Sequence, residues 1–430
     1  MALIPHQVIL NAASDSGIQE SRSASKKKAP RMHGMMPNVW YGAIPSLSVL
    51  RGHPSFVCLP ERDDVTLEYG RASYRYIKED DVLWSRLHAG RLTTGNLNAA
   101  LGFYEPCAGK VLRLHKSWLS HSRIVSVYHH LCDDVYDIGA AKGAEGDAHG
   151  RMRNEQAHVL ANQQGLRHGN DTDEEAFEAL KLRKARSLKS MRDMNKVRCA
   201  WGSAQEATTL AILCEHWRTD KMLFEVGLFA LNDDEIRLRG FSPDDLPPIG
   251  ATPDALCMDT CDKSVAVSTF GSFLDACAVV EVKNSCPFTF SCSSRGKCAF
   301  HVRDRGPREY VDVLHVPQLQ FQMLCSNTPS AFLVSKSASK GIRIFQMARD
   351  DEYIQCMLTV LRSFYKTYVV KKRVPPVNAL SNLKEHQELL MRTRAIARAC
   401  LLVDVIDDQE GLLQNIVHSK TIDKRYFLDS

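Results

Sequence analysis

Apolar residues recur at helical spacing in the first half of the chain. Residues 80–105 predict a helix, a short Thr/Gly turn and a second helix that begins near Asn96. Thr93 and Thr94 are natural N-cap residues for that second helix, because their hydroxyls can accept hydrogen bonds from its first backbone amides. A longer helix is predicted over residues 174–219. The regular secondary structure of residues 80–105 and 174–219 is therefore expected to be helical.

Strand patterns dominate after residue 219. Short apolar runs with alternating polar positions, bounded by Gly, Pro and Asp, are typical of strands. The predicted strands span residues 222–231, 249–259, 278–284, 331–337 and 342–348, and helices are predicted over 316–325, 351–370 and 380–406. This order predicts an α/β fold, with a mixed, twisted sheet of about five strands flanked by helices and a site at one edge.

Several stretches interrupt these patterns. Residues 1–45 are rich in Ser, Lys and Pro and predict a disordered basic tail. Insertions are predicted over residues 139–175 and 286–315, where large apolar residues are few or the spacing is irregular. We therefore expect one domain over residues 46–375 and a C-terminal helical extension over residues 376–430.

Composition and charge exclude few classes of protein or partner. The chain has 430 residues, 44% of them hydrophobic and 24% charged, and a net charge of +5, which suits a globular protein and is compatible with an anionic partner. Residues 181–198 carry eight basic residues and one acidic residue, Asp193, on a predicted helix. A solvated helix face and a contact with DNA phosphates both remain open for this stretch.

The cysteines and the terminus bear on the compartment. The chain has 14 cysteines but no secretory signal at its start, so free thiols in a reducing, intracellular compartment are expected. Residues 21–31 are either a basic nuclear or organellar targeting segment or a solvated terminus. No run approaches the about 18 apolar residues of a membrane span, so a soluble protein without a membrane partner is expected.

Charged residues lie on two of the predicted strands. Glu281 and Lys283 are two residues apart, so they share one face of their strand, where an apolar core would make them costly. Asp254 follows Pro253, which indicates a bend or a sheet edge. Antiparallel pairing of the two segments would bring Asp254 beside Glu281. The alternative is a surface hairpin with an ordinary salt bridge between its strands.

This set of side chains suits phosphodiester hydrolysis. Two carboxylates bind hard cations such as Mg²⁺ through oxygen, with Mn²⁺ as a substitute. A metal ion can generate hydroxide and stabilise the leaving oxygen. A neighbouring lysine can orient the attacking water and offset negative charge in the transition state.

Four blocks of the chain match the order of motifs in a known family. They are WSRLHAGRLTTG at residues 84–95, WGSAQE at 201–206, GATPDAL with VEVKNSCPF at 250–256 and 280–288, and QLQFQ at 318–322. In these blocks the chain resembles the YqaJ-type, lambda-exonuclease-like branch of the PD-(D/E)XK nucleases, the viral recombination exonucleases. The resemblance covers roughly residues 84–370, with interruptions, and implies a restriction-endonuclease-like core.

The resemblance also implies roles for the charged residues. Asp254 and Glu281 would bind the metal directly, and the carbonyl of Val282 would complete its coordination. Glu206 would be a further acidic ligand or would hold a ligand water, and Lys283 would be the catalytic lysine.

The same resemblance implies a role for the glutamines of residues 318–322. Gln320 would contact the attacking water or the scissile phosphate, with Gln318 as the alternative if the register is shifted by two residues. An ordinary polar helix face is the other interpretation of these glutamines.

The first block would bind the 5′-terminal phosphate of the strand being degraded. Arg91, Thr93 and Thr94 match the family positions, with Arg86 about one helical turn earlier. Arg and Thr side chains and free amides at a helix start are suitable phosphate donors. Gly95 departs from the family pattern, in which many relatives carry Ser, and an ordinary N-cap turn is the alternative.

The function expected from these blocks is a Mg²⁺-dependent exonuclease that recognises 5′-phosphates on double-stranded DNA ends, in recombination or repair. A structure- or site-specific endonuclease and a catalytically inactive DNA-binding relative are the alternatives. A homo-oligomer and a partner recombinase or single-strand-binding protein are compatible with the resemblance, but the sequence does not select them.

The second predicted insertion contains two further groups. Cys286, Cys292, Cys298 and His301 have a looser spacing than standard zinc sites, so Zn²⁺ is not expected. Three arginines follow in the sequence RDRGPRE: Arg303, Arg305 and Arg308. A DNA-facing loop and a solvated loop both remain open for them.

Overall fold

The computed structural model describes residues 47–59, 87–132 except Ala89, 194–260, 277–292 and 298–416. Two compact units are distinguished, Met1–Pro37 and Asn38–Ser430, and all the described residues belong to the second. The predicted basic tail, the 139–175 insertion, most of the basic helical stretch and Arg86 lie outside the described residues.

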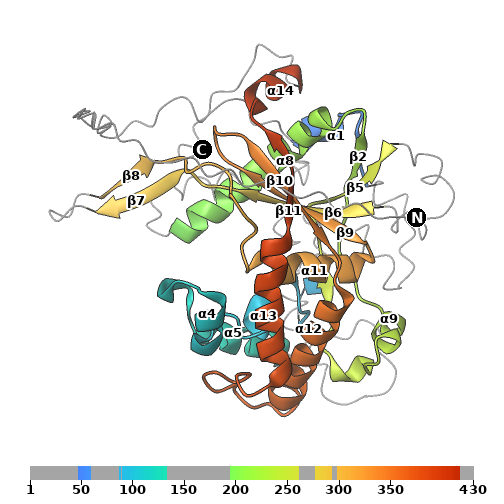
Figure 1. Cartoon of the computed structure of the whole chain (residues 1–430), viewed down its shortest axis with the longest axis vertical. Helices are drawn as coiled ribbons and strands as arrows, with labels where there is room; N and C mark the ends of the chain where they lie inside the picture. The colour runs from blue at the N-terminus through green and yellow to red at the C-terminus, as the bar shows by residue number, and fades with distance from the viewer. Residues whose placement is uncertain are drawn as a thin grey trace, which may run out of the picture. The chain divides into compact units, whose positions relative to one another are not determined.

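A mixed sheet of seven strands forms the centre of the described unit (Figure 1). Its order is β1-β2-β5-β6-β9-β10-β11, with parallel pairs at β1–β2 and β6–β9 and antiparallel pairs elsewhere. The strands are β1 (Phe56–Val57), β2 (Lys221–Phe224), β5 (Ala255–Asp259), β6 (Cys277–Asn284), β9 (Ser330–Lys336), β10 (Ile342–Ala348) and β11 (Leu401–Ile406). The α/β class and the mixed sheet are confirmed, but the sheet has seven strands rather than about five.

Helices cover both faces of this sheet. Alternate residues of each strand enter opposite cores: Val279 belongs to one and Val280 to the other. The core with Val280 is closed by α1 (Leu47–Arg51), α8 (Met194–His216) and α14 (Gln409–Ile416). The core with Val279 is closed by α3 (Thr94–Ala100), α4 (Pro106–Leu112), α5 (Ser122–Cys132), α11 (His315–Ser326), α12 (Asp351–Phe364) and α13 (Lys384–Ala399). Because both faces are buried, the central strands are almost continuously apolar.

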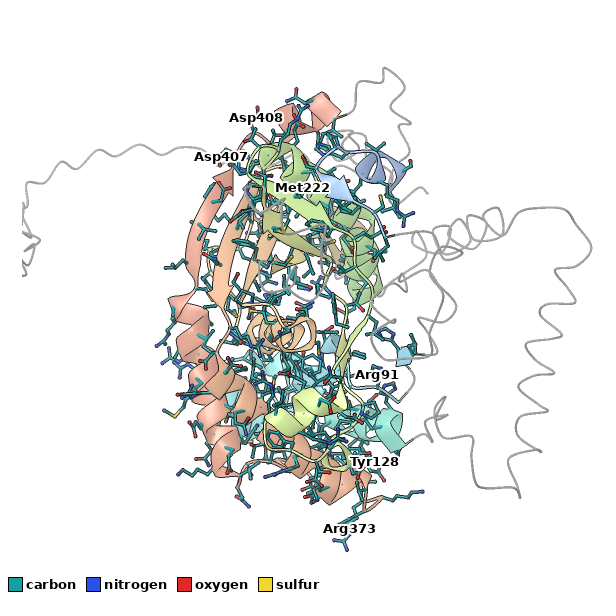
Figure 2. All side chains as sticks on the ribbon, turned by 90° about the vertical axis from the view of Figure 1, so that its right-hand side faces the viewer. Arg91, Tyr128, Met222, Arg373, Asp407 and Asp408 are labelled. Atoms are coloured by element: carbon teal, nitrogen blue, oxygen red, sulfur yellow. The ribbon has the colours of Figure 1, made fainter. Side chains whose placement is uncertain are left out.

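In Figure 2, Tyr128 of α5 and Arg91 before α3 lie in the lower part of the described unit, and Met222 of β2 lies in its upper part. None of the described helices is both long enough and apolar enough to cross a membrane.

Smaller elements complete the described unit. The predicted strand over residues 222–231 divides into β2 and β3, which belong to different sheets, and the interruption contains Gly227, a residue that weakens strands. The remaining elements are β3 (Phe229–Ala230) with β4 (Gly250–Ala251), β7 (Phe288–Cys292) with β8 (Cys298–Val302), α9 (Asp233–Leu238), the 3₁₀ helices η4 (Lys116–Trp118) and η5 (Pro243–Asp245), and the π-helix η7 (Tyr365–Val369) after α12.

The C-terminal region differs from its predicted form. The helix expected over residues 380–406 ends at Ala399, and β11 follows it, antiparallel to β10. The apolar run of β11 includes three β-branched residues, and its last residue, Ile406, is buried under α8 and α14. α13 also packs against α12. Residues 376–416 are therefore part of the central architecture and not a separate helical extension.

Candidate active site

Asp254 and Glu281 lie on neighbouring antiparallel strands, as their sequence pattern predicted. Ala255 of β5 is the register partner of Val280 of β6. Asp254 immediately precedes β5, and its Oδ2 accepts a hydrogen bond of 2.6 Å from the backbone amide of Val282. The carboxylate of Asp254 is thereby fixed beside the middle of β6.

Glu281 is buried among three side-chain donors. The ammonium of Lys283 donates to its Oε1 and forms an ion pair with it. Gln318 Nε2 donates to Oε1 and Gln322 Nε2 donates to Oε2, each at 2.6 Å. A buried carboxylate needs such partners, and here they fix its orientation as well.

Two glutamines, Gln318 and Gln322, contact Glu281, and neither is Gln320, which the sequence motif selected. Gln318 and Gln322 are four residues apart, so they share the face of α11 that meets β6. Gln320 points elsewhere: its Nε2 donates to Ala348 O at 2.8 Å and its Oε1 accepts from Asp350 N at 2.9 Å. The structure therefore does not bring Gln320 to the carboxylates, whereas the alternative, Gln318, reaches Glu281.

Charges in this cluster influence one another strongly. Burial raises the pKa of Asp254 well above its usual range, and the neighbouring Glu281 and Glu206 carboxylates raise it further. Burial opposes the charge on Lys283, but the Glu281 and Asp254 carboxylates outweigh that effect and raise its pKa. Lys283 therefore keeps its proton at neutral pH, and the site concentrates acidic groups around it.

Glu206 approaches the cluster from α8. Two of the contacts that position this part of the helix come from Asn284, at the end of β6. Its Nδ2 donates to Gly202 O at 3.1 Å, and its Oδ1 accepts from Thr209 Oγ1 at 2.7 Å. The predicted proximity of Glu206 to the other carboxylates is thus supported by its effect on the pKa of Asp254.

A second lysine, absent from the predicted site, supports the same part of α8. Lys336 ends β9, is 4% exposed, and donates to Gln205 Oε1 at 3.0 Å. Burial lowers its pKa to about 8, although Asp304 opposes that effect. Its register partner is Asn284, so Lys336 lies beside the end of β6, but no pattern in the sequence indicated that it would be buried there.

His315, the first residue of α11, is another nearby polar group that the sequence did not indicate. Burial lowers its pKa well below the usual range, and the charges of Arg308 and Lys283 lower it further. Its buried Nδ1 has no hydrogen-bond partner among the described residues. The imidazole is therefore neutral, and it lies near the positive charges of Arg308 and Lys283.

The predicted phosphate-binding block is joined to the segment that carries Asp254. Leu92 forms a parallel bridge with Ile249, and Gly250 N donates to Leu92 O at 3.1 Å. The guanidinium of Arg91 donates to Ile249 O at 3.0 Å. A Cβ at position 250 would lie 2.9 Å from Arg91 Cδ, so the close approach requires glycine there. The first and third family blocks are thus physically connected.

The two threonines lie where the helical pattern placed them. Thr93 is the N-cap of α3 with an extended backbone, and its side chain makes no capping hydrogen bond. Thr93 and Thr94 are both partly exposed, and Gly95 is exposed.

The cysteines and histidine of the second predicted insertion are spread along a two-stranded ribbon. Cys292 pairs with Cys298 at one end of β7–β8, whereas His301 pairs with Thr289 near the other end. His301 is three positions from Cys298 along the strand, which corresponds to about 10 Å. Cys286 lies before the ribbon begins.

Within the part of the chain that the structure describes, no group of three or more His, Cys, Asp or Glu side chains is arranged to hold a metal ion. The donors that do converge are the carboxylates of Asp254 and Glu281, with Glu206 acting on Asp254 through its charge. Any metal bound here would take its remaining ligands from Glu206, backbone oxygen, water or substrate.

Comparisons with protein-family models, with curated proteins and with solved structures found no match to this chain.

Proposed function

We propose that this chain is a metal-dependent DNA nuclease with a PD-(D/E)XK core, which hydrolyses phosphodiester bonds at double-stranded ends that carry a 5′-phosphate. One observation carries the proposal: Asp254, Glu281 and Lys283 meet on neighbouring strands, with Asp254 bonded to the amide of Val282 and Lys283 bonded to Glu281. Two carboxylates can hold a divalent cation that activates water, and a neighbouring lysine can stabilise negative charge on the phosphate.

The donor set fits a hard divalent cation. Asp254 and Glu281 would hold Mg²⁺, or Mn²⁺ in its place, with the Val282 carbonyl and Glu206 as further oxygen donors. Burial and, after it, the neighbouring Glu281 and Glu206 carboxylates raise the pKa of Asp254, and a bound cation would offset both effects, which supports this fit. When bound, the metal would supply Lewis acidity and an activated water.

The protein's own groups have separate tasks in this proposal. Lys283 holds a proton in a buried site, where its ammonium can orient the attacking water and stabilise charge that develops on the phosphate. Gln318 and Gln322 keep the Glu281 carboxylate in one orientation, so no reorganisation is needed when the substrate arrives.

End recognition rests on the phosphate block. The bridge between Leu92 and Ile249 ties this block to the segment leading to Asp254, so a terminal phosphate held near Thr93 would position its strand relative to the carboxylates. Arg91, Thr94 and Arg86 belong to the same proposed set, because guanidinium and hydroxyl groups donate to phosphate oxygens.

An endonuclease on the same core is the second candidate. One observation favours it: Arg91 already donates to the backbone carbonyls of Leu87 and Ile249, which reduces its capacity to grip a terminal phosphate. A catalytically inactive DNA-binding protein would not need the bonded set of Asp254, Glu281 and Lys283.

Labelled DNA in linear and circular form tests the proposal. With Mg²⁺ the chain should degrade a linear duplex that bears 5′-phosphates, and should act more slowly on one that bears 5′-hydroxyls. Nicking of closed circles would support the endonuclease instead. If the duplex is bound but not cleaved with either Mg²⁺ or Mn²⁺, the nuclease proposal fails.

A further inference from the structure

Residues 303–308, here called the strap, connect β8 to the loop before α11 and are fixed to the ends of two central strands. Arg303 N donates to Pro287 O at 2.7 Å. The Asp304 carboxylate accepts from Ser339 N at 2.8 Å and from Ser339 Oγ at 2.9 Å. Arg308 N donates at 2.9 Å to the hydroxyl at the end of β9. The strap backbone is therefore held at three points without any arginine side chain.

These anchors direct the strap's arginines outward. Asp304 points inward to Ser339, and Arg303 and Arg305 on either side of it are both exposed. Neither makes a side-chain hydrogen bond or ion pair with another described residue. Their charges are available to a partner.

The strap leads directly to the candidate active site. The hydroxyl that accepts from Arg308 N belongs to Ser335, the register partner of Lys283 in the parallel pair β6–β9. The side chain of Arg308 is 41% exposed, and its ion pair with Asp312 is 3.3 Å long. Such an exposed pair contributes little, so Asp312 does not prevent Arg308 from binding a stronger anion.

We propose that the strap binds the phosphate backbone of the DNA strand next to the scissile phosphate, with Arg308 nearest to Lys283 and with Arg303 and Arg305 farther along the strand. This inference rests on the proposed nuclease function and names the surface that guides its substrate. Arginine suits the task because its fork of donors can bind phosphate oxygens in pairs. Arg303 and Arg305 lie on either side of Asp304, so their long side chains can reach different phosphates.

The alternative is a solvated loop, in which the arginines serve only solubility. The strap's fixed backbone distinguishes the two interpretations. Removing the side chains of Arg303 and Arg305 breaks none of the three anchors, so the substitution should leave folding unchanged and act only on a partner.

The test uses the full chain and a short blunt duplex with 5′-phosphates. The double variant Arg303→Ala/Arg305→Ala should raise KM about tenfold while kcat at saturation is unchanged. The slope of log affinity against log salt concentration should fall by about 2, since two phosphate contacts are lost. Arg303→Lys/Arg305→Lys should recover most of the affinity, because lysine keeps the charge.

A matched control removes two charges elsewhere. Lys371 and Arg373 are exposed after η7, and Figure 2 shows Arg373 at the helical end, away from β2. Lys371→Ala/Arg373→Ala should leave KM and the salt slope at wild-type values. An equal loss in the control and the strap variant would show a general charge effect and overturn the proposal.

The outcomes separate the strap from the nuclease function. If the wild type cleaves and the strap variant keeps both its KM and its salt slope, the strap is a solvated loop and the nuclease proposal stands. If the wild type does not cleave, duplex binding is measured directly by fluorescence anisotropy. Weaker binding by the strap variant would then support the strap alone, whereas unchanged binding, or no binding by the wild type, would overturn it.

Discussion

The carboxylate of Glu281 accepts hydrogen bonds from three side chains, and two of those donors come from one face of α11. In the proposed function Glu281 binds the metal, and removing a single donor would let its carboxylate change orientation. Supporting contacts of this kind typically change metal affinity or activity by about 10- to 100-fold. The role of each glutamine can therefore be distinguished experimentally.

Gln318→Ala should lower kcat about 10- to 100-fold and leave the thermal unfolding temperature unchanged, because it removes one of the two donors to Glu281 Oε1 at a partly exposed position. Gln320→Ala should instead lower stability by about 1–3 kcal/mol, because the Ala348 carbonyl and the Asp350 amide lose their partner. Activity assays and denaturant unfolding measure the two effects. The opposite result would restore Gln320 as the residue nearest to the chemistry.

Lys336 should make stability depend on pH in the alkaline range. Its pKa is about 8 in the folded protein and about 10.4 in an unfolded chain. Between those values the unfolded state binds more protons, so stability rises with pH across this window. Lys336→Met should abolish that rise, and it should stabilise the protein by about 1–3 kcal/mol at pH 7 by removing a buried charge.

Denaturant unfolding across the window from pH 7 to about 10.5 measures this effect. Lys340, an exposed lysine on the turn after the same strand, provides the control. Lys340→Met removes the same charge and should leave the slope of stability against pH unchanged. A Lys336→Met variant with the wild-type slope would contradict the account.

At the residue scale the sequence predicts chemistry well only where strand alternation applies. The shared face of Glu281 and Lys283 follows from a period of two, and the structure confirms it. Gln320 was selected by its place in a motif, although the helical period puts Gln318 and Gln322 together on the opposite face. Lys336 could not be predicted, because its burial depends on α8 packing against β9.

At the scale of elements, the strands that position the site were predictable and the sheet edges were not. β6, β9 and β10 have long apolar runs between turn residues, and their predicted spans agree with the structure within one residue. The strand predicted over residues 249–259 divides into β4 and β5, which belong to different sheets. β1 has only two residues, too few for any pattern. β11 follows directly on α13, and an apolar run that continues from a helix cannot be distinguished from it by periodicity alone.

β11 should prove necessary for stability. Ile406→Ala should cost about 2–4 kcal/mol, because Ile406 is buried in the core between the sheet and α8. Leu401→Ala in the same strand should change stability by less than about 0.5 kcal/mol, because Leu401 is 65% exposed. Denaturant unfolding compares the two. Equal small effects would contradict the burial of Ile406 in this core.

At the scale of the whole described unit, the site unites parts of the chain that are far apart in sequence. The segment at Arg91 is bonded to the strand before Asp254, α8 brings Glu206, and α11 brings Gln318 across the sheet. The order of the four sequence blocks predicted that these parts belong together. Their distances and contacts depend on the completed sheet and could not be derived from the sequence.

The measurement that tests the central claim most directly compares Mg²⁺-dependent cleavage of a linear duplex by the wild type and by Lys283→Ala. The wild type should cleave with Mg²⁺ and lose activity when the metal is chelated. Lys283→Ala should lower kcat about 100- to 1000-fold and change duplex affinity by less than about threefold, because the ammonium acts on the transition state. Full cleavage by Lys283→Ala, or cleavage that persists without a divalent metal, would contradict the account.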